Sequence, residues 1–361
     1  MRASRLHTLL RGISLMTALL LMLSLPFSAA ADFVFSFLPT KEVDGVVYEA
    51  RPQSDLTTIL LIGYDHDDKG DLSIEHHGYN NGGQSDFLLL LLVDHANEQI
   101  RQLQINRDTM SPIKLVSVQG NYLGTRTYQI CLAHAYGRSQ EENNKNTVWA
   151  VEKLLGIEAA GDGAKIDWYM TMDISGISRL NDLLGGVTVT IEDDFSAVDP
   201  AMVPGATLKL TGWQAERFCR GRYGIGDQSN ESRMVRQRTY LTAASGVLRE
   251  RMKDNISFSR TLLNEMGIIY DTQADLDAGF GFTTGNDSGT PVDDTGSHYL
   301  MTNESLDSIV GVMARSIDYT LLPIETLEGT AVLSTDGFIH FNLAEGAAQN
   351  WALDAFYRPL N

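Results

Sequence analysis

Apolar and polar residues alternate in blocks along the chain, and the first three blocks have the pattern of β-strands. Residues 57–62 form an apolar run, residues 86–93 are mostly leucine, and residues 99–105 alternate apolar and polar side chains. Runs of this length, bounded by turn residues, are typical of strands. The leucine run is too short to span a membrane, and its uniformity predicts a strand that is covered on both faces.

The ends of these three strands carry charged side chains. Short connections favour antiparallel neighbours, and in that arrangement the end of the first strand, the start of the second and the end of the third lie at one sheet edge. That edge carries Asp65, Asp86, Arg107 and Asp108. The sequence therefore predicts carboxylates beside an arginine. The alternative is that Asp86 caps a turn and that Arg107 and Asp108 only pair with each other.

Later in the chain, strand patterns alternate with helix patterns. Strand patterns cover residues 167–173 and 187–191, and residues 329–341 resemble a hairpin. Helix patterns occupy residues 146–155, 174–184, 303–317 and 344–357, and a further helix could be capped by Ser229, Asn230 or Ser232. This alternation predicts an α/β fold, an α-β-α sandwich around a central mixed and largely antiparallel sheet.

Arginine is concentrated in one stretch of this acidic chain. Arg220 and Arg222 are two residues apart, so an extended segment would place them on one face. On the helix that follows, Arg233, Arg236 and Gln237 fall on one side. Arginine grips phosphate or carboxylate with a flat, permanently charged fork. The stretch therefore predicts an anion-binding site, and the alternative is a surface helix with solvated arginines.

The composition is that of a folded, acidic protein. Of the 361 residues, 43% are hydrophobic and 20% are charged, which is ordinary for a globular domain. The formal net charge of -18 argues against binding to nucleic acid, which requires a basic surface. The two cysteines, Cys131 and Cys219, exclude a disulfide-rich scaffold and a four-cysteine zinc site. Two buried free thiols are expected, and a single bridge is the alternative.

The N-terminus has the pattern of an export signal. Three arginines precede an uncharged run from Gly12 to Ala31, which is close to the roughly 20 residues that span a bilayer. The positive-inside rule then places the folded part of the chain outside the cell membrane, although cleavage by a signal peptidase is the alternative to an anchor. The expected segments are a cytoplasmic basic tail over 1–11, a transmembrane signal anchor over 12–31, a stalk over 32–55, a catalytic core over 56–255, and a C-terminal completion over 256–361 with an acidic insertion at about 271–297.

A series of motifs in fixed order resembles one known family. The motifs are ILLIGYD, SDFLLLLLVD, QINRDT, LAHAYG, LLGGVTVTI, LTGWQAERFCRGRY and RMVRQR, and they extend over residues 57–251. They resemble the LytR-CpsA-Psr family of membrane-anchored, extracytoplasmic phosphotransferases of Gram-positive bacteria. The resemblance implies transfer of a glycopolymer, such as wall teichoic acid or capsular polysaccharide, from an undecaprenyl-pyrophosphate carrier to peptidoglycan. The product would be a phosphodiester, and Mg²⁺ would act near the pyrophosphate.

The resemblance also implies roles for particular residues. Asp65 and Asp86 match the metal-facing carboxylates, which suits Mg²⁺ because this ion takes one or two carboxylates together with substrate phosphates. Asp108 or Asp227 would act as the base or orient an arginine, and the sequence leaves this choice open. The expected pyrophosphate ligands are Arg107, Arg220, Arg222, Arg233, Arg236 and Gln237. Of all these residues, the expected catalytic ones are Asp86, Arg107, Arg220 and Arg222.

The chain departs from the family pattern at three places. Gln84 stands where the family usually has arginine, Asn106 stands where it usually has proline, and the loop from Asp227 to Arg233 is longer than in many members. The first departure puts one anion contact in question. Two other functions stay open at this point: a polyprenyl-pyrophosphate hydrolase that uses the same site, and a non-catalytic envelope protein that binds lipid or has a regulatory role.

Overall fold

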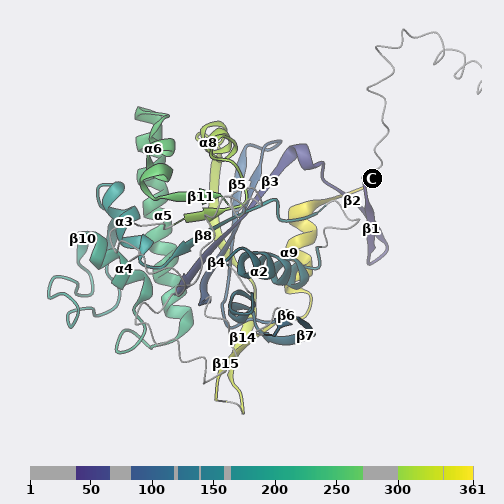
Figure 1. Cartoon of the computed structure of the whole chain (residues 1–361), viewed down its shortest axis with the longest axis horizontal. Helices are drawn as coiled ribbons and strands as arrows, with labels where there is room; N and C mark the ends of the chain where they lie inside the picture. The colour runs from purple at the N-terminus through teal and green to yellow at the C-terminus, as the bar shows by residue number, and fades with distance from the viewer. Residues whose placement is uncertain are drawn as a thin grey trace, which may run out of the picture. The chain divides into compact units, whose positions relative to one another are not determined.

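A seven-stranded mixed sheet forms the centre of the computed structural model (Figure 1). The structure describes residues 38–65, 83–117, 121–137, 140–157, 164–270, 300–335 and 337–360. In spatial order the strands of the sheet are β11 (Ile268–Tyr270), β12 (Leu300–Thr302), β8 (Trp168–Asp173), β3 (Leu56–Asp65), β4 (Gln84–Asp94), β5 (Gln99–Ile105) and β13 (Thr320–Thr326). The three strands predicted first, β3 to β5, are therefore neighbours within this sheet.

The pairing of β3, β4 and β5 is antiparallel, as expected from the sequence. Asp65 of β3 pairs with Gln84 of β4, and Leu88 of β4 pairs with Ile105 of β5. The end of β3, the start of β4 and the end of β5 therefore share one edge, which confirms the predicted edge. The expectation of a largely antiparallel sheet is wrong. In the described part of the chain, β11–β12, β8–β3 and β5–β13 are parallel, whereas β12–β8, β3–β4 and β4–β5 are antiparallel.

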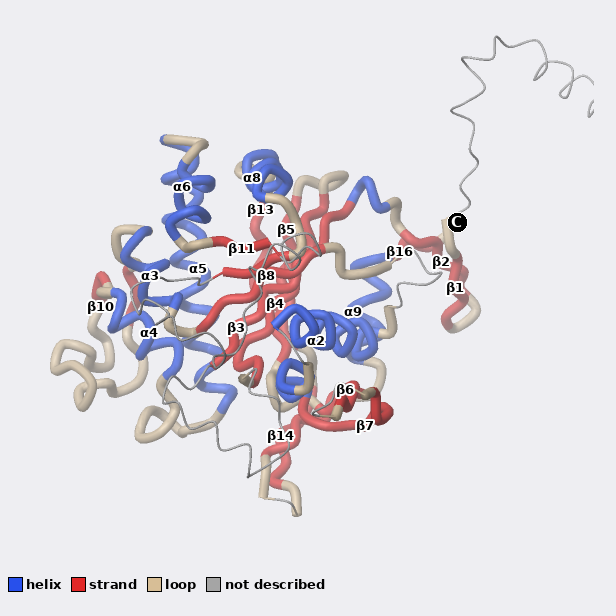
Figure 2. The backbone as a smooth tube through the Cα atoms, viewed as in Figure 1, coloured by secondary structure: helices blue, strands red, loops and turns tan. Residues whose placement is uncertain are grey.

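Helices cover both faces of this sheet (Figure 2). Leu60, Leu90 and Leu103 lie opposite one another on adjacent strands and are fully buried in a core with residues of α2 (Gln140–Leu155) and α9 (Ala347–Phe356). On the other face, Gln104 donates Nε2 to Gln237 Oε1 of α5 (Asn230–Asp254) at 3.0 Å. Residues 87–93 of β4 are all apolar because both faces of this strand are covered.

A second core joins α5 to three other helices and a short hairpin. The helices are α3 (Gly176–Leu183), α4 (Gly212–Arg220) and α6 (Phe258–Glu265), and the hairpin strands are β9 (Thr188–Thr190) and β10 (Thr207–Lys209). Phe195 and Phe218 lie at its centre, with ring centroids 5.8 Å apart. Thr211 caps α4 through a reciprocal capping box with Gln214, which fixes where the arginine-rich stretch begins.

The described part of the segment expected to be a stalk contains two strands. β1 (Thr40–Val43) and β2 (Val46–Ala50) form a hairpin, and β2 also pairs with β16 (Tyr357–Pro359) at the end of the chain. Ala50 is buried in the same core as α2 and α9. β11, β12 and β13 of the C-terminal part belong to the central sheet, and α8 (Leu306–Arg315) lies between β12 and β13 along the chain.

Two further hairpins lie beyond the sheet edge that carries the predicted site. One consists of β6 (Met110–Val116) and β7 (Tyr122–Gln129), and the other of β14 (Gly329–Leu333) and β15 (Ile339–Leu343). A 3₁₀ segment, η2 (Ile130–Ala135), follows β7 and leads into α2. Both cysteines are buried free thiols, as predicted.

Several expectations fall on residues that the structure does not describe. These are the basic tail, the signal anchor, the N-terminal part of the stalk and the acidic insertion. Within the described ranges, no helix has the length and apolar character that crossing a bilayer requires.

Candidate functional site

Three segments bring the charged side chains of the site together. β4 begins at Gln84 with Asp86 two residues further on, and a tight turn follows β5, closed by the Thr109 amide donating to the Asn106 carbonyl at 3.0 Å. The third segment is the first turn of α5, where Ser229 caps the helix by accepting from the Ser232 amide at 3.0 Å. The polar side chains of these segments therefore meet at the predicted sheet edge.

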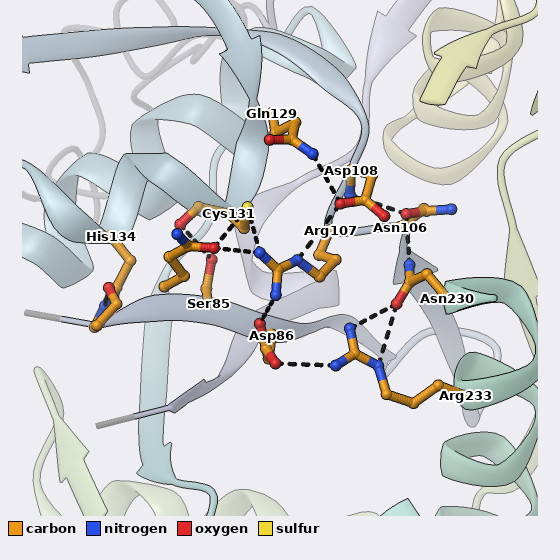
Figure 3. A network of polar contacts seen from close by, with 12 residues as sticks. Ser85, Asp86, Asn106, Arg107, Asp108, Gln129, Cys131, His134, Asn230 and Arg233 are labelled. Carbon is orange, nitrogen blue, oxygen red and sulfur yellow. Dashed lines mark hydrogen bonds and ion pairs between the residues drawn. The ribbon is translucent and has the colours of Figure 1, made fainter. Parts of the chain in front are cut away.

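Asp86 lies at the centre of the site, between two arginines (Figure 3). Arg107 Nη1 donates to Asp86 Oδ1, and Arg233 Nη1 donates to Asp86 Oδ2 at 3.0 Å. The side chains of Asp86 and Arg233 are 9% and 5% exposed. Each oxygen of the Asp86 carboxylate binds a different guanidinium, so Asp86 holds Arg107 and Arg233 side by side. A salt bridge with one arginine would position only one positive charge.

The remaining groups around Arg107 are polar but uncharged, apart from one carboxylate. Arg107 Nη2 donates to Gln84 Oε1 and lies 3.2 Å from the Cys131 sulfur, while Nε lies 3.5 Å from Asp108 Oδ1. Burial lowers the pKa of Arg107, but the neighbouring Cys131, Asp86 and Asp108 more than offset this, so the pKa is raised. Burial raises the pKa of the Cys131 thiol to about 11, so the thiol stays neutral at pH 7.

Two asparagines connect the turn after β5 to the first turn of α5. Asn230 Nδ2 donates to Asn106 Oδ1 at 2.7 Å, and Asn230 Oδ1 accepts from Arg233 Nη2 at 2.6 Å. The Asp108 amide also donates to Asn106 Oδ1, at 2.9 Å. Asn106 therefore helps to position Arg233 against Asp86.

Replacing Asn230 with alanine is expected to disturb both stability and activity. Asn106 and Arg233 would each lose a buried partner, which costs roughly 1–3 kcal/mol of unfolding free energy. Because Arg233 would then be held by Asp86 alone, turnover is expected to fall about tenfold. Denaturant unfolding and initial rates measure the two effects. The control is Asn264→Ala on the exposed side of α6, and equal rates for the two variants would contradict this role.

Asp108 is a buried carboxylate beside the arginines. Gln129 Nε2 donates to Asp108 Oδ1 at 3.0 Å and to the Ile339 carbonyl at 2.8 Å. Among the described residues, none makes a hydrogen bond to the other oxygen, Oδ2. Burial raises the pKa of Asp108, although Arg107, Arg222 and Arg233 counteract this. A carboxylate with a raised pKa and a free oxygen is suited to accept a proton.

Asp227, the other candidate base, has a structural role in this chain. Its Oδ1 accepts from the Ser229 amide at 2.9 Å and from the Ser232 hydroxyl at 2.6 Å, so it braces the cap of α5. These hydrogen bonds lower the pKa of Asp227 to about 2. A carboxylate of this pKa is a weak base near pH 7, so the geometry favours Asp108.

Arg222 and Arg220 occupy different positions. Arg222 is half-buried, donates Nε to the Gln228 carbonyl at 3.1 Å, and lies close enough to Asp108 and Arg233 to affect the pKa of both. Arg220 lies in the last turn of α4, where it pairs with Glu216 at 3.8 Å, and its side chain is 39% exposed. The structure therefore brings Arg222 to the cluster, whereas Arg220 lies at its periphery.

Arg236 and Gln237 face protein groups, not the cluster around Asp86. Arg236 is 2% exposed and donates to the carbonyls of Phe218 and Gly221 and to the carboxylate of Asp193. Gln237 accepts from Gln104 and donates to the Cys219 carbonyl at 3.4 Å. The expectation that both bind pyrophosphate is therefore not supported by their positions. Their contacts attach α5 to α4 and to the sheet.

The metal site expected at Asp65 and Asp86 is only partly described. The backbone of Asp65 ends β3 opposite Gln84, but its side chain lies outside what the structure describes. Among the described residues, no group of three or more His, Cys, Asp or Glu side chains could hold a metal ion. The two carboxylates of Asp65 and Asp86 would suit only an ion that takes most of its ligands from water or a substrate, as Mg²⁺ does with phosphates.

Three residues that contact the arginines of the site were not predicted to do so from the sequence. Gln84 and Cys131 contact Arg107, and Asn230 contacts Arg233, yet each belongs to a residue type that usually has a structural role. His134 is fully buried beside Asn144, with Nδ1 3.1 Å from the Gly83 carbonyl. It therefore holds the start of β4. Only contact with Arg107 or Arg233 identifies Gln84, Cys131 and Asn230 as residues of the site.

Comparisons with known proteins agree on family and fold. Residues 38–293 match the LytR_cpsA_psr family model. "Biofilm regulatory protein A" of Streptococcus mutans is 28% identical over 203 residues, which are 54% of this chain and 45% of that protein. "Polyisoprenyl-teichoic acid--peptidoglycan teichoic acid transferase TagU" of Bacillus cereus is 27% identical over 53% of this chain and 52% of its own. The chain thus matches only about half the length of these curated relatives.

The fold is also that of solved structures. One of them, described as TagT bound to LI-WTA, superimposes with a TM-score of 0.55 and 18% sequence identity. The match covers 89% of this chain and 96% of that one. At this identity the likeness establishes a shared mixed α/β fold.

Proposed function

Because this chain belongs to the LytR_cpsA_psr family, we propose that it is a phosphotransferase that moves a glycopolymer from a polyprenyl-pyrophosphate carrier to peptidoglycan. The observation that carries the proposal is the position of Asp86 between Arg107 and Arg233 at one sheet edge. Buried and fixed positive charges of this kind stabilise the negative charge that develops in phosphoryl transfer. The relative named as a teichoic acid transferase supports the same reaction class. We further propose that the catalytic part lies outside the cell membrane, attached by the N-terminal segment.

The proposed reaction is a displacement at phosphorus. The oxygen of an acceptor hydroxyl on peptidoglycan forms a bond to the phosphorus nearer the sugar, and the bond from that phosphorus to the polyprenyl phosphate breaks. Asp108 Oδ2 takes the proton of the hydroxyl, and polyprenyl monophosphate leaves. Arg107, Arg222 and Arg233 compensate the charge on the phosphate oxygens. The guanidinium groups of Arg107 and Arg233 cost little to reorganise, because Asp86 and Asn230 already hold them.

Mg²⁺ is part of the proposal, with Asp86 and Asp65 as its protein ligands. When bound, it would neutralise phosphate charge and help to align the donor. Asp86 retains lone pairs beyond those used by the two arginines, since each of its oxygens accepts one hydrogen bond in the described part of the site.

A transfer assay tests the proposed function. The full chain in detergent would receive a polyprenyl-pyrophosphate oligosaccharide, a peptidoglycan oligomer and Mg²⁺, with and without a chelator. A chelator-sensitive phosphodiester between sugar and peptidoglycan, detected by mass spectrometry, is the expected result. Release of a sugar phosphate without linkage would replace the proposal with a hydrolase. Tight donor binding without turnover would replace it with a lipid-binding or regulatory protein.

The pH dependence of transfer should distinguish the two candidate bases. Asp108 must be deprotonated to act, so the rate should fall as the pH decreases through its pKa, which lies above the usual 3.8. Asp108→Asn should lower the rate about a hundredfold and remove this acidic limb. Asp227→Asn should leave the limb in place, because the pKa of Asp227 is about 2. If the decrease in rate at low pH disappeared only in the Asp227→Asn variant, Asp227 would be the base.

Arg236→Lys should affect stability and leave donor binding intact. Lysine keeps the charge but cannot satisfy Asp193 and the carbonyls of Phe218 and Gly221 together, so the unfolding free energy should fall by roughly 3 kcal/mol. Denaturant unfolding measures this loss, and donor affinity per folded molecule should stay unchanged. Arg260→Lys, at an exposed pair with Asp307, should change stability by less than about 0.5 kcal/mol. Lost affinity with normal stability would show that Arg236 binds the donor.

A further inference from the structure

Large apolar side chains are exposed on the hairpin formed by β14 and β15. Val332, Leu333 and Phe338 are 47%, 68% and 61% exposed, and every residue of β14 is exposed. The hairpin projects beyond the neighbouring elements at the bottom of Figure 1. Isolated exposed apolar residues are common, but a group of them at the end of a projecting hairpin indicates a contact surface.

This hairpin is attached directly to the candidate site. The Phe341 amide donates to the Asp108 carbonyl at 2.8 Å, and the Ile339 carbonyl accepts from Gln129 Nε2 at 2.8 Å. Gln129 is the residue that also binds the Asp108 carboxylate. The tip of the hairpin therefore has a fixed relation to the sheet edge that holds Asp86 and Arg107.

The neighbouring hairpin of β6 and β7 adds aromatic and basic character. Tyr122, Leu123 and Tyr128 are among its exposed residues, and Arg126 is exposed between them. Residues 109–137 contain no aspartate or glutamate, although the chain carries a net charge of -18. The β6–β7 hairpin combines exposed aromatic, aliphatic and basic side chains with no acidic residue, which makes it complementary to an anionic lipid interface. The β14–β15 hairpin supplies apolar side chains, and its one acidic residue, Asp336, lies outside the described residues.

We propose that the exposed ends of these two hairpins enter the headgroup region of an anionic phospholipid bilayer. Leu333, Phe338 and Leu123 would lie among the upper acyl chains, while Tyr122 and Arg126 would lie at the level of the headgroups. The site edge would then face the membrane surface. This contact rests on the proposed function, which places a polyprenyl-linked donor in the same membrane. Its test measures membrane contact and needs no enzymatic turnover.

Quenching of a fluorescent label tests the contact in the full chain. Cys131 and Cys219 are buried, so Leu333→Cys offers one accessible thiol for an environment-sensitive dye. The labelled chain would be reconstituted into vesicles that contain phosphatidylglycerol and a lipid with a nitroxide on its upper acyl chain. The matched control is Ile256→Cys, at an exposed residue between α5 and α6. Both variants have the same N-terminus, so any membrane contact through that segment is common to both. Only a difference in quenching between positions 333 and 256 therefore reports on the hairpin.

The dye at position 333 should be quenched about twofold more than the dye at position 256. Arg126→Gln, or vesicles with phosphatidylcholine alone, should reduce this difference. Equal quenching at both positions would overturn the proposal. A blue shift without vesicles that grows with protein concentration would also overturn it, because a second copy of the chain would then cover the hairpin. A chain that fails the transfer assay can still give the quenching difference, so the two proposals fail separately.

Discussion

Replacing Asp86 with asparagine is expected to lower the rate of glycopolymer transfer by about a thousandfold. The carboxylate binds Arg107 and Arg233 through different oxygens, so the amide would present an N–H group to one guanidinium. The two arginines would lose their common partner, and the proposed Mg²⁺ ligand would be lost with it. Initial rates at saturating donor measure the effect, and circular dichroism verifies the fold.

The matched control for this variant is Asp354→Asn. Asp354 also binds an arginine, Arg101, at 2.7 Å, but its side chain is 77% exposed and lies on α9. Its loss should change the rate by less than about twofold. A rate for Asp86→Asn within about tenfold of the unmodified chain would mean that Asp86 is not central to the reaction.

Arg107→Lys is expected to have a comparable effect, about a thousandfold loss of rate, although it preserves the charge. The Arg107 guanidinium contacts Asp86, Gln84 and Cys131 at once, and Nε faces Asp108 at 3.5 Å. A lysine ammonium cannot reproduce this fork. The donor affinity should also fall, because the position of Arg233 depends on the shared Asp86. Initial rates and donor titrations measure the two effects.

Arg101→Lys, on the strand β5 that precedes Arg107, provides the control. Arg101 binds Glu325 with Nε and Nη2, both at 3.2 Å, so it has a similar fork at a distance from the site. Its replacement should affect stability more than rate. Full activity of Arg107→Lys would show that charge alone suffices, and the geometric argument for the site would fail.

The sequence predicted the central part of the fold because burial leaves a pattern. β3, β4 and β5 are apolar or alternating, and their order and direction follow from adjacent pairing. β7 was missed because most of its side chains are exposed, so no alternation marks it. β16 was missed because its partner, β2, lies about 300 residues earlier in the chain, as the Arg358–Glu49 pair shows with a separation of 309. β1 and β2 form a local hairpin, but their residues were assigned to the polar stalk.

The candidate site was predictable where it depends on strand direction and unpredictable where it depends on helix packing. Asp86 and Arg107 meet because β4 starts and β5 ends at one edge. Arg233 and Arg236 are three residues apart on α5, about 60° around the helix axis. This difference turns Arg233 toward Asp86 and Arg236 toward the end of α4. No local pattern reports where α4 lies, so the sequence alone assigned both arginines to one ligand.

The fate of the sugar-proximal phosphorus tests the proposed reaction most directly. A donor with ³²P at that position would be incubated with the full chain, Mg²⁺ and a peptidoglycan oligomer, and the products would be separated. The proposed displacement predicts that the label moves into the peptidoglycan as a phosphodiester, while unlabelled polyprenyl monophosphate is released. Label in free sugar phosphate, or label that stays in the intact donor, would contradict it.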